Sequence, residues 1–582
     1  MHHRLGSRHT HALAWLVAAA LQTAPTAAQT SINFTDVAET AGVRVLHSPP
    51  LTSSFMYGGG AAGDLNNDGW PDLFVVGGGG PLGPDRLFLN NGDGTFTDHA
   101  AAWGVADLHV GFGIALGDYN RDGWLDAFVA SRGNPDSQET GQHRLYRNDA
   151  GQGFTNVALA AGVATTAPSV PDGFGAAWGD YDLDGWLDLF VAGWQTQSDG
   201  NRLFRNNRDG TFIDVTDSAI AFDLIDTFGF APRFVDMNGD RYPEILLSGD
   251  YRTSRYLVNN GDGTFSERTA TSGLGLETNG MGQTVGDFDN DGRLDWYVTS
   301  IFESSAGFGN ALYRNLGDDQ YQELAVSAGV TDGGWGWGAT AVDFDHNGWT
   351  DILATNGFSG GYWLDSTRLF LNSGALQFSD VAVAHGINHT GQGRGLLHFD
   401  YDLDGDEDVV IFSISDFLRL YRNDISGADT HWLRVTLSNA GRSNLAPNGY
   451  GAKIHATTGG VTRMRAVCGG DNYVSQSELE AHFGLADAAM IDELRVVWPT
   501  GEETVLRDLP ADQHLLIEAA TLAGDVTGDG RVDLSDLGAL LTAFGACSGA
   551  PEYTTAADLD GSGCVELSDL GELLAHYGEA LW

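Results

Sequence analysis

One loop pattern recurs along the sequence and places acidic side chains at alternate positions. In its clearest copy, residues 180–188 read Asp-Tyr-Asp-Leu-Asp-Gly-Trp-Leu-Asp, with carboxylates at loop positions 1, 3, 5 and 9. Together with the backbone carbonyl at position 7, these oxygens form the cage that a hard cation such as Ca²⁺ takes. An apolar stretch, residues 189–192, follows where the helix-flanked calcium loop would have a helix carrying a glutamate at position 12. The pattern therefore predicts calcium loops set inside β-hairpins.

We number the seven copies loop 1 to loop 7. Loop 4 departs from the pattern, with Arg241 in place of the Gly at position 6 and Glu244 at position 9, and loop 6 has Asn347 at position 5. The predicted ligands are Asp64, Asn66, Asp68 and Asp72 in loop 1, Asp118, Asn120, Asp122 and Asp126 in loop 2, Asp180, Asp182, Asp184 and Asp188 in loop 3, Asp236, Asn238, Asp240 and Glu244 in loop 4, Asp287, Asp289, Asp291 and Asp295 in loop 5, Asp343, Asp345, Asn347 and Asp351 in loop 6, and Asp400, Asp402, Asp404 and Asp408 in loop 7.

The alternative for any one loop is a polar hairpin whose carboxylates are simply solvated. A single copy would leave that interpretation open. Several like charges in each of seven loops at matched spacing would destabilise the folded chain unless a cation compensated them. Calcium is therefore the favoured interpretation for all seven loops, the two departures included.

The elements around the loops predict the fold. Loops begin 51 to 62 residues apart, which is the period of a propeller blade. Small or apolar residues precede each loop, an apolar strand follows it, and a further hairpin with Asn-Gly or Asp-Gly turns, as in residues 86–96, comes next. Each unit thus holds about four strands. We expect an all-β, seven-bladed β-propeller over residues 29–426.

The two ends of this region complement each other. The seventh unit stops at residues 419–424 and lacks the last strand of the other units, whereas residues 32–38, Ile-Asn-Phe-Thr-Asp-Val-Ala, form an orphan copy of that strand. We predict that the orphan strand completes the seventh blade and leaves no open sheet edge.

These repeats resemble the FG-GAP/VCBS family, whose units look like the blades of integrin α-subunit propellers. The resemblance rests on the Gly-Asp-[Phe/Tyr/Leu]-[Asp/Asn]-x-Asp-Gly-x-x-Asp pattern and covers nearly all of residues 29–426. It implies the same propeller fold and the same loop ligands.

Residues 427–521 change character, because the acidic loops stop and strands that alternate in polarity begin, as in residues 431–437 and 452–457. We expect a small β-sandwich-like domain. The motifs His-Trp-Leu at 431, Asn-Gly-Tyr-Gly-Ala-Lys at 448 and Val-Trp-Pro-Thr-Gly at 497 resemble the ASPIC/UnbV domain. Residues 29–521 as a whole look like the cartilage acidic protein family. Residues 469–476, Gly-Gly-Asp-Asn-Tyr-Val-Ser-Gln, are either a binding loop or a structural turn, and a turn is favoured.

Residues 522–582 hold two further loops, each followed by an apolar helix pattern. Oxygen ligands fall at positions 1, 3, 5, 9 and 12: Asp525, Thr527, Asp529, Asp533 and Asp536 in one loop, and Asp558, Asp560, Ser562, Glu566 and Asp569 in the other. Two loop-plus-helix units with Asp at position 12 resemble a type I dockerin, a small α-helical calcium module. That resemblance implies a cohesin-like partner, contacted at positions 10 and 11 of each loop, here Leu534, Ser535, Leu567 and Ser568. The alternative is a calcium-stapled cap packed on its own chain.

Composition limits the class of partner. With 78 acidic against 30 basic residues the net charge is −48, which argues against nucleic acid or an anionic membrane as partner. Filling all nine loops with calcium would bring the charge to about −30. Residues 1–28 read as a secretory signal peptide, with an N-terminal anchor as the alternative, and no later segment is apolar enough to span a bilayer. Cys547 and Cys564 are close enough in sequence to pair in an oxidising compartment.

No catalytic motif stands out: the sequence has no Gly-x-Ser-x-Gly elbow, no His-Glu-x-x-His and no phosphate-binding Gly loop. His385, His389 and His398 are interpreted as structural or surface histidines. We therefore expect a secreted, non-catalytic, calcium-stabilised binding or adhesion protein tethered through its dockerin-like tail, with an extracellular protein or glycan as ligand. The alternative is a polysaccharide-degrading enzyme or accessory subunit that the tail delivers.

Overall fold

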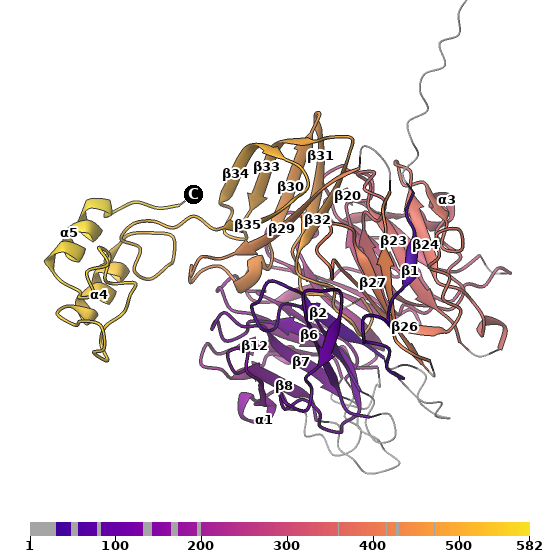
Figure 1. Ribbon diagram of the computed structural model, residues 1–582, viewed down its shortest axis with the longest axis horizontal. Coiled ribbons are helices and arrows are strands. Elements are labelled where there is room, and N and C mark those ends of the chain that lie inside the picture. Colours follow the sequence, from indigo (N-terminus) through magenta and orange to yellow (C-terminus); the bar gives the residue numbers. More distant parts are fainter. Residues whose placement is uncertain are drawn as a thin grey trace, which may run out of the picture.

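The computed structural model describes residues 31–47, 56, 58–77, 83–131, 142–164, 173–194, 200–305, 307–358, 360–414, 416–426, 430–470 and 472–581. The predicted signal peptide, residues 1–28, lies outside these residues. Strands dominate the described chain (Figure 1).

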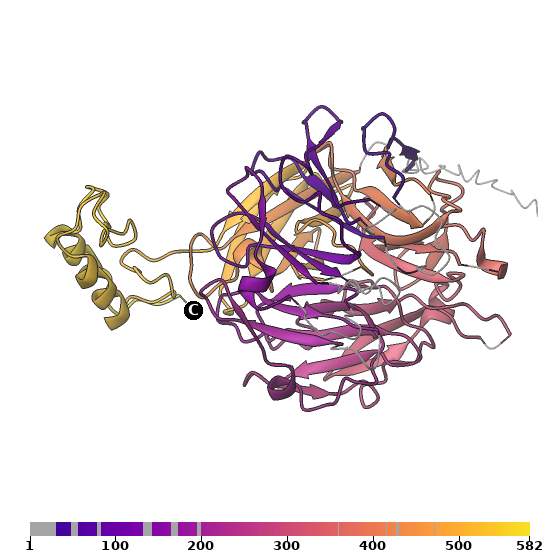
Figure 2. The ribbon, with the colours of Figure 1, turned by 90° about the horizontal axis from the view of Figure 1, so that it is seen from below.

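Seven four-stranded antiparallel sheets make up the first and largest part of the molecule. Figure 2 shows them following one another around the molecule in sequence order, from indigo through magenta to orange. The sheets comprise β2 (Gly60–Gly63), β3 (Asp72–Val75), β4 (Arg86–Asn90) and β5 (Phe96–Asp98); β6 (Gly111–Gly117), β7 (Asp126–Ser131), β8 (Arg144–Asn148) and β9 (Phe154–Asn156); β10 (Ala176–Gly179), β11 (Asp188–Val191), β12 (Arg202–Asn206) and β13 (Phe212–Asp214); β14 (Gly229–Val235), β15 (Glu244–Gly249), β16 (Arg255–Asn259) and β17 (Phe265–Glu267); β18 (Gln283–Gly286), β19 (Asp295–Val298), β20 (Ala311–Gly317) and β21 (Gln320–Glu323); β22 (Gly336–Val342), β23 (Asp351–Asn356), β24 (Arg368–Asn372) and β25 (Phe378–Asp380); and β26 (Gln392–Phe399), β27 (Asp408–Ile414), β28 (Arg419–Asn423) and β1 (Phe34–Asp36).

Small residues allow the first strands of neighbouring sheets to approach closely. β2 reads Gly-Ala-Ala-Gly and is buried throughout. A Cβ atom on Gly60 would lie 2.4 Å from the Phe412 ring, and one on Gly179 would lie 2.4 Å from the Phe234 ring. The run of small residues before each loop is therefore a packing requirement of the first strands.

The seventh sheet closes as the sequence predicts. β1 pairs antiparallel with β28, so Phe34 lies opposite Asn423, although 389 positions separate them. Ile32 and Phe34 are buried in the core that this sheet shares with its neighbour. The prediction that residues 32–38 supply the missing strand is confirmed.

Asparagines join each sheet to the one before it. The third strand of every sheet has an Asn at or near its end, and the Nδ2 of this Asn donates to the carbonyl at loop position 2 of the preceding sheet. The bonds run from Asn90 to Tyr401, Asn148 to Leu65, Asn206 to Tyr119, Asn259 to Tyr181, Asn315 to Met237, Asn372 to Phe288 and Asn423 to Phe344, at 2.8 to 3.0 Å. Because the first sheet bonds to the last, the seven sheets form a closed circle.

Residues 430–519, the second domain, form two sheets over a shared core, as their alternating pattern predicts. One sheet contains β32 (Ala481–Ala486), β29 (His431–Ser438) and β35 (Gln513–Glu518), and the other contains β31 (Val461–Ala466), β30 (Lys453–Thr458), β33 (Met490–Val497) and β34 (Glu503–Pro510). In β30 buried and half-buried residues alternate strictly.

The second domain sends one segment, residues 469–477, between the first strands of the ring; we call it the plug. Gln476 bonds to the backbone of β2 and β6, Gly469 to β14, and Asn472 to β22 and β26. Tyr473 is fully buried between Phe230 and Trp337. Since these contacts reach the first strands of five sheets, the plug lies at the axis of the ring. Of the two interpretations left open for this segment, a structural role is the one its contacts favour.

Residues 522–581, the tail module, carry helices α4 (Leu534–Ala543) and α5 (Leu567–His576), joined by a Cys547–Cys564 disulfide between their flanking segments. Figure 1 shows this module standing apart from the sheets. It touches the second domain through bonds from Ser443 N to Gly528 O and from Asn444 Nδ2 to Asp529 O.

The remaining helices are single turns: α1 (Ala158–Ala161), α2 (Thr216–Ala219), α3 (Ala325–Ala328), η2 (Gly360–Tyr362) and η3 (Pro447–Gly449). Among the described residues, none of the helices combines the length and apolar character needed to cross a membrane.

Candidate metal centres

The acidic loops join the first and second strands of each sheet and share one backbone shape. Position 4 takes a positive φ, as at Leu183 with +56°, and the Gly at position 6 takes another, as at Gly185 with +85°. A Gly adopts this left-handed conformation without the steric cost that a side chain incurs. These two bends turn the side chains at positions 1, 3 and 5 toward one another.

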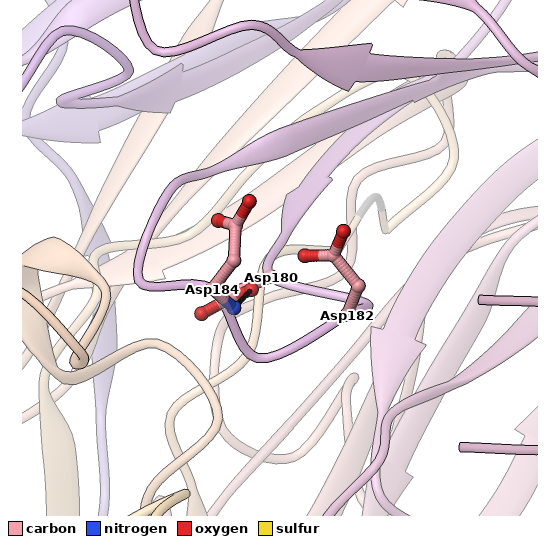
Figure 3. Close-up of side chains that lie close together, drawn as sticks. All are labelled: Asp180, Asp182 and Asp184. Atoms are coloured by element: carbon pink, nitrogen blue, oxygen red, sulfur yellow. Dashed lines mark hydrogen bonds between the residues drawn. The ribbon is translucent and has the colours of Figure 1, made fainter. Parts of the chain in front are cut away.

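The carboxylate at position 1 is fixed by the loop backbone. In loop 3, Asp180 accepts hydrogen bonds from Asp184 N at 2.9 Å and Gly185 N at 2.8 Å. The equivalent pair of bonds recurs in loops 1, 2, 5, 6 and 7 at 2.7 to 3.1 Å. Figure 3 shows Asp180, Asp182 and Asp184 close together on this loop.

Three predicted ligands converge in each of several loops. One carboxylate oxygen from each of three residues lies within 4.8 Å of the other two, which is the spacing that a shared cation requires. These groups are Asp180, Asp182 and Asp184 in loop 3, Asp287, Asp289 and Asp291 in loop 5, Asp343, Asp345 and Asp351 in loop 6, and Asp400, Asp402 and Asp404 in loop 7.

Some of the converging oxygens have no protein partner. Among the described residues, Asp182 Oδ1, Asp289 Oδ1 and Asp402 Oδ1, all at loop position 3, are buried without a hydrogen bond, and so is Asp126 Oδ2 at position 9 of loop 2. An unpaired buried carboxylate oxygen is costly, so such atoms normally bind a cation or water. The donor set and its orphaned oxygens therefore fit a hard, oxygen-preferring cation such as Ca²⁺.

Burial and crowding change the acidity of these groups. Burial, followed by the charge of neighbouring carboxylates, raises the pKa of Asp118 to about 6, of Asp180 to about 8 and of Asp126 to about 9. The pKa of Asp188 is also raised well above its usual value, for the same reasons. Without a bound cation, Asp180 and Asp126 therefore keep their protons to a higher pH than ordinary carboxylates do.

The position 9 carboxylates link the loops to the asparagine circle. Asp188 Oδ1 accepts from Asn206 N at 2.8 Å, and loops 1, 2, 5, 6 and 7 repeat this bond with their own Asn. Sequence reasoning missed these asparagines, although an Asn recurs at or near the end of the third strand in all seven repeats.

Arginines of the same sheets pair with some of the loop carboxylates. In loop 3, Arg205 lies 2.9 Å from Asp182 and Arg208 lies 2.7 Å from Asp184; in loop 5, Arg314 lies 2.6 Å from Asp289. These arginine side chains are 35 to 51% exposed, so they reach the loops from the solvent side.

Two positively charged side chains of the second domain also contact the acidic loops, and sequence reasoning missed both contacts. Buried Arg434 of β29 lies 2.9 Å from Asp400 in loop 7, and Lys453 of β30 lies 2.8 Å from Asp236 in loop 4. The carboxylate-rich loops are thus also the surface on which the second domain sits.

The tail module brings Asp525, Asp529 and Asp536 together in its first loop. Asp533, the predicted position 9 ligand, also caps α4 by accepting from Ser535 N. In the second loop, Asp569 accepts from Asp560 N and Glu566 N, and Asp558 accepts from Gly563 N and the Tyr553 hydroxyl. The predicted partner residues are all exposed: Leu534, Ser535, Leu567 and Ser568.

Family models match two parts of the chain. The FG-GAP-like repeat model matches residues 64–129, 118–191, 180–247 and 236–298. The ASPIC and UnbV model matches residues 441–523. The first match covers loops 1 to 5, and the second covers most of the second domain.

The chain is similar to cartilage acidic protein 1 of three vertebrates. Cartilage acidic protein 1 of Mus musculus is 29% identical over 259 residues, which are 43% of this chain and 31% of that protein. The Homo sapiens protein gives 29% over the same length, covering 30% of it. The Xenopus tropicalis protein is 23% identical over 470 residues, 76% of this chain and 61% of that protein. The chain thus spans about a third of the mammalian relatives and three fifths of the amphibian one.

Solved structures give looser matches. Bacillus licheniformis rhamnogalacturonan lyase PL11 aligns with a TM-score of 0.35 and 14% identity, over 67% of this chain and 75% of that one. The V. cholerae biofilm matrix protein Bap1 aligns with a TM-score of 0.30 and 12% identity, over 80% of this chain and 62% of that one. The chain thus carries a segment that matches FG-GAP-like repeats and, after it, a segment that matches the ASPIC and UnbV model, and it is similar to cartilage acidic protein 1 of three vertebrates over the shares given above.

Proposed function

We propose that this chain is a secreted, non-catalytic binding protein whose seven-bladed propeller is stabilised by calcium. The ions would be held by the side chains at positions 1, 3, 5 and 9 of the acidic loops. Bound calcium supplies a divalent positive charge and a set of oxygen-coordination bonds, which would neutralise buried carboxylates. The Cys547–Cys564 disulfide supports an oxidising, extracellular compartment.

One observation carries the calcium proposal: buried carboxylate oxygens at equivalent loop positions lack any protein partner. Asp182 Oδ1, Asp289 Oδ1 and Asp402 Oδ1 repeat this feature in three sheets. A solvated polar hairpin would expose these atoms to water. Burying them in the same geometry three times favours a ligand that all three loops share.

Calcium removal tests the proposal directly. A ligand that binds only the folded state stabilises it by about 2.7 kcal/mol per site at a hundredfold excess over Kd. The mature chain should therefore melt several degrees lower in excess EGTA than in calcium, and calcium but not sodium should restore the original melting temperature. A melting curve that EGTA leaves unchanged would contradict the proposal.

We further propose that the tail module tethers the chain to a cohesin-like partner. Each helix and the residue that follows it expose a matched apolar set: Leu534, Leu541 and Phe544 at α4, and Leu567, Leu574 and Tyr577 at α5, all at least 42% exposed. The competing role, a cap on the same chain, is supported by the two hydrogen bonds from residues 443–444 to the first tail loop. Those bonds leave both apolar sets free.

A double substitution separates tethering from capping. Asp525→Ala with Asp558→Ala should abolish calcium-dependent helicity in the tail, because small paired calcium helices bury too little surface to fold alone. We expect immobilised residues 522–582 to capture a partner in calcium and the double variant to capture none. A second double variant, Leu541→Ala with Leu574→Ala, keeps the metal ligands and removes two exposed apolar side chains. It separates loss of the surface contact from loss of the calcium-dependent fold.

If the double variant still captures the same proteins, binding resides elsewhere and the tail is a cap. Depolymerisation of a glycan by the purified chain, measured with and without residues 522–582, would instead favour the enzymatic alternative.

A further inference from the structure

A lysine of the second domain places its positive charge in loop 4. Lys453 Nζ, from β30 of the second domain, lies 2.8 Å from Asp236 Oδ2. Asp236 occupies position 1, and its side chain is only 6% exposed, while that of Lys453 is 19% exposed. Lys453 is the only lysine in the sequence, and among the described residues its one ion pair is with Asp236.

The other ligand side chains of loop 4 accept hydrogen bonds from within the loop, as ligand side chains of loops 1 and 2 also do. Glu244 accepts from Met237 N at 2.8 Å through Oε2 and from Asn238 Nδ2 at 3.1 Å through Oε1. The side-chain oxygen of Asn238, Oδ1, accepts from Asp240 N at 2.8 Å. In the described chain, the buried side-chain oxygens without a partner include atoms of loops 2, 3, 5 and 7 but none of loop 4. Within the same described residues, the ligand positions of loops 1 and 6 also lack such an atom, so the feature that sets loop 4 apart is the Lys453 ammonium on its first ligand.

The second departure of loop 4 also serves the domain contact. Arg241 stands where the other loops have Gly, yet it takes the same left-handed conformation, with φ of +82°. That conformation costs a side-chain-bearing residue about 1 kcal/mol. The Arg241 guanidinium donates to Thr500 O in the turn between β33 and β34. Lys453 belongs to the second domain and Arg241 donates a hydrogen bond to it. Both unusual features of loop 4 are therefore contacts between the ring and the second domain.

In loop 7 a positively charged side chain also lies close to the first ligand, but this loop keeps the features of a calcium loop. Arg434 approaches Asp400, but it also pairs with Glu478 and Glu480, so its charge is shared among three carboxylates. Loop 7 keeps its Gly at position 6, its Asp at position 9 and the unpartnered Asp402 Oδ1. Lys453, by contrast, places an undivided charge on the first ligand of loop 4.

We infer that loop 4 is a calcium loop converted into an interdomain anchor, in which the Lys453 ammonium replaces the metal ion. This anchor holds the second domain on the ring whether or not calcium is present. The inference rests on the proposed function only for the contrast with the other loops, because the Lys453–Asp236 pair exists without any metal.

Counting bound ions tests the replacement. Native mass spectrometry of the mature chain in calcium should give one ion fewer for Asp180→Asn in loop 3 than for the wild type. The matched change Asp236→Asn in loop 4 should leave the count unchanged. Loss of one ion from Asp236→Asn would overturn the inference. A wild type that binds no calcium would instead contradict the proposed function, and the coupling experiment then decides the anchor by itself.

Thermal coupling between the two residues, measured in excess EGTA, tests the anchor. Lys453→Met should lower the melting temperature by several degrees in the wild-type background and should have almost no effect when Asp236→Asn is already present, because the pair is then broken. Lys453→Arg, which keeps the charge, should retain most of the stability. Additive effects of Lys453→Met and Asp236→Asn would overturn the inference.

Discussion

At the scale of single residues, the acidic loops combine fixed geometry with strongly perturbed acidity. The backbone holds the position 1 carboxylate from one side, as Gly185 N and Asp184 N hold Asp180. The other side of each loop gathers carboxylates whose pKa values burial has raised. Protons and calcium therefore compete for the same oxygens, and pH decides how much calcium contributes to stability.

The pH dependence follows from the direction of these shifts. In the calcium-free folded chain, the pKa of Asp118 is about 6, of Asp287 about 7 and of Asp180 about 8, all above the ordinary value of 3.8. Between about pH 4 and pH 8 the folded state thus binds more protons than the unfolded state, so its stability falls as pH rises. Calcium offsets that loss, because it binds the ionised carboxylates.

We therefore expect the melting temperature gap between calcium-loaded and calcium-stripped protein to widen from about pH 5 to about pH 8. Asp209, a surface carboxylate whose pKa is lowered by bonds from Thr211, offers a control: Asp209→Asn should leave the gap unchanged. A gap that stays constant or narrows toward pH 8 would contradict this prediction.

At the scale of elements, the strand β1 completes the seventh sheet and closes the ring. It covers the edge of β28, and its Phe34, together with the preceding Ile32, packs into a core formed by two sheets. An uncovered edge of this kind pairs readily with another chain.

Deleting residues 32–37 should destabilise the ring and cause association, which size-exclusion chromatography and thermal unfolding would measure. The substitution Phe34→Ala should give a milder form of the defect, at about 3 kcal/mol or more. Thr35→Ala in the same strand, where the side chain faces solvent, is the matched control and should change little. A monomeric deletion variant as stable as the full chain would contradict the closure scheme.

The elements were predictable where the determinants are local in sequence. Acidic loops, Asn-Gly and Asp-Gly turns and the orphan strand each carry their signal within about ten residues, and the sheets form where those signals place them. Lys453 and Arg434 were missed because their partners lie 217 and 34 residues away. The plug was expected to be a structural turn, but its position at the axis of the ring was not predicted, because its partners lie as far as 417 residues away. No local spacing reveals a charge that one domain inserts into another. The position of Asp533 as a helix cap was missed for a different reason: capping and metal binding both favour Asp at that place.

At the scale of the whole molecule, the second domain and the ring are fastened at several points on one face. The plug fills the axis, Lys453 and Arg241 join loop 4 to β30 and the turn after β33, and Arg434 reaches loop 7. Arg121 in loop 2 adds a further link by donating to Arg442 O and Leu445 O. With so many shared contacts, we expect the ring and the second domain to unfold together.

Tyr473→Ala tests this cooperation. The ring of Tyr473 lies 5.6 Å from that of Phe230 and 5.3 Å from that of Trp337, and its hydroxyl donates to Met56 O. Truncation should lower the free energy of unfolding by about 3 kcal/mol or more and shift the single unfolding transition of both parts. Tyr577→Ala in the tail, where the side chain is 44% exposed, should leave that transition in place. Two separate transitions in the wild type would contradict cooperative unfolding.

The pairing of Phe34 with Asn423 also sets an order of events during synthesis. A ribosome makes the chain from its N-terminus at about 5 to 20 residues per second, so β1 must wait some tens of seconds for the strand it pairs with. Until Asn423 emerges, six sheets can assemble in turn while β1 remains single and the edge it will cover does not yet exist. The plug emerges later still, from residues 469–477, and can enter only a ring that is nearly complete. The last contacts formed therefore join residues far apart in the sequence, and factors that bind nascent polypeptides would act on β1 during this interval.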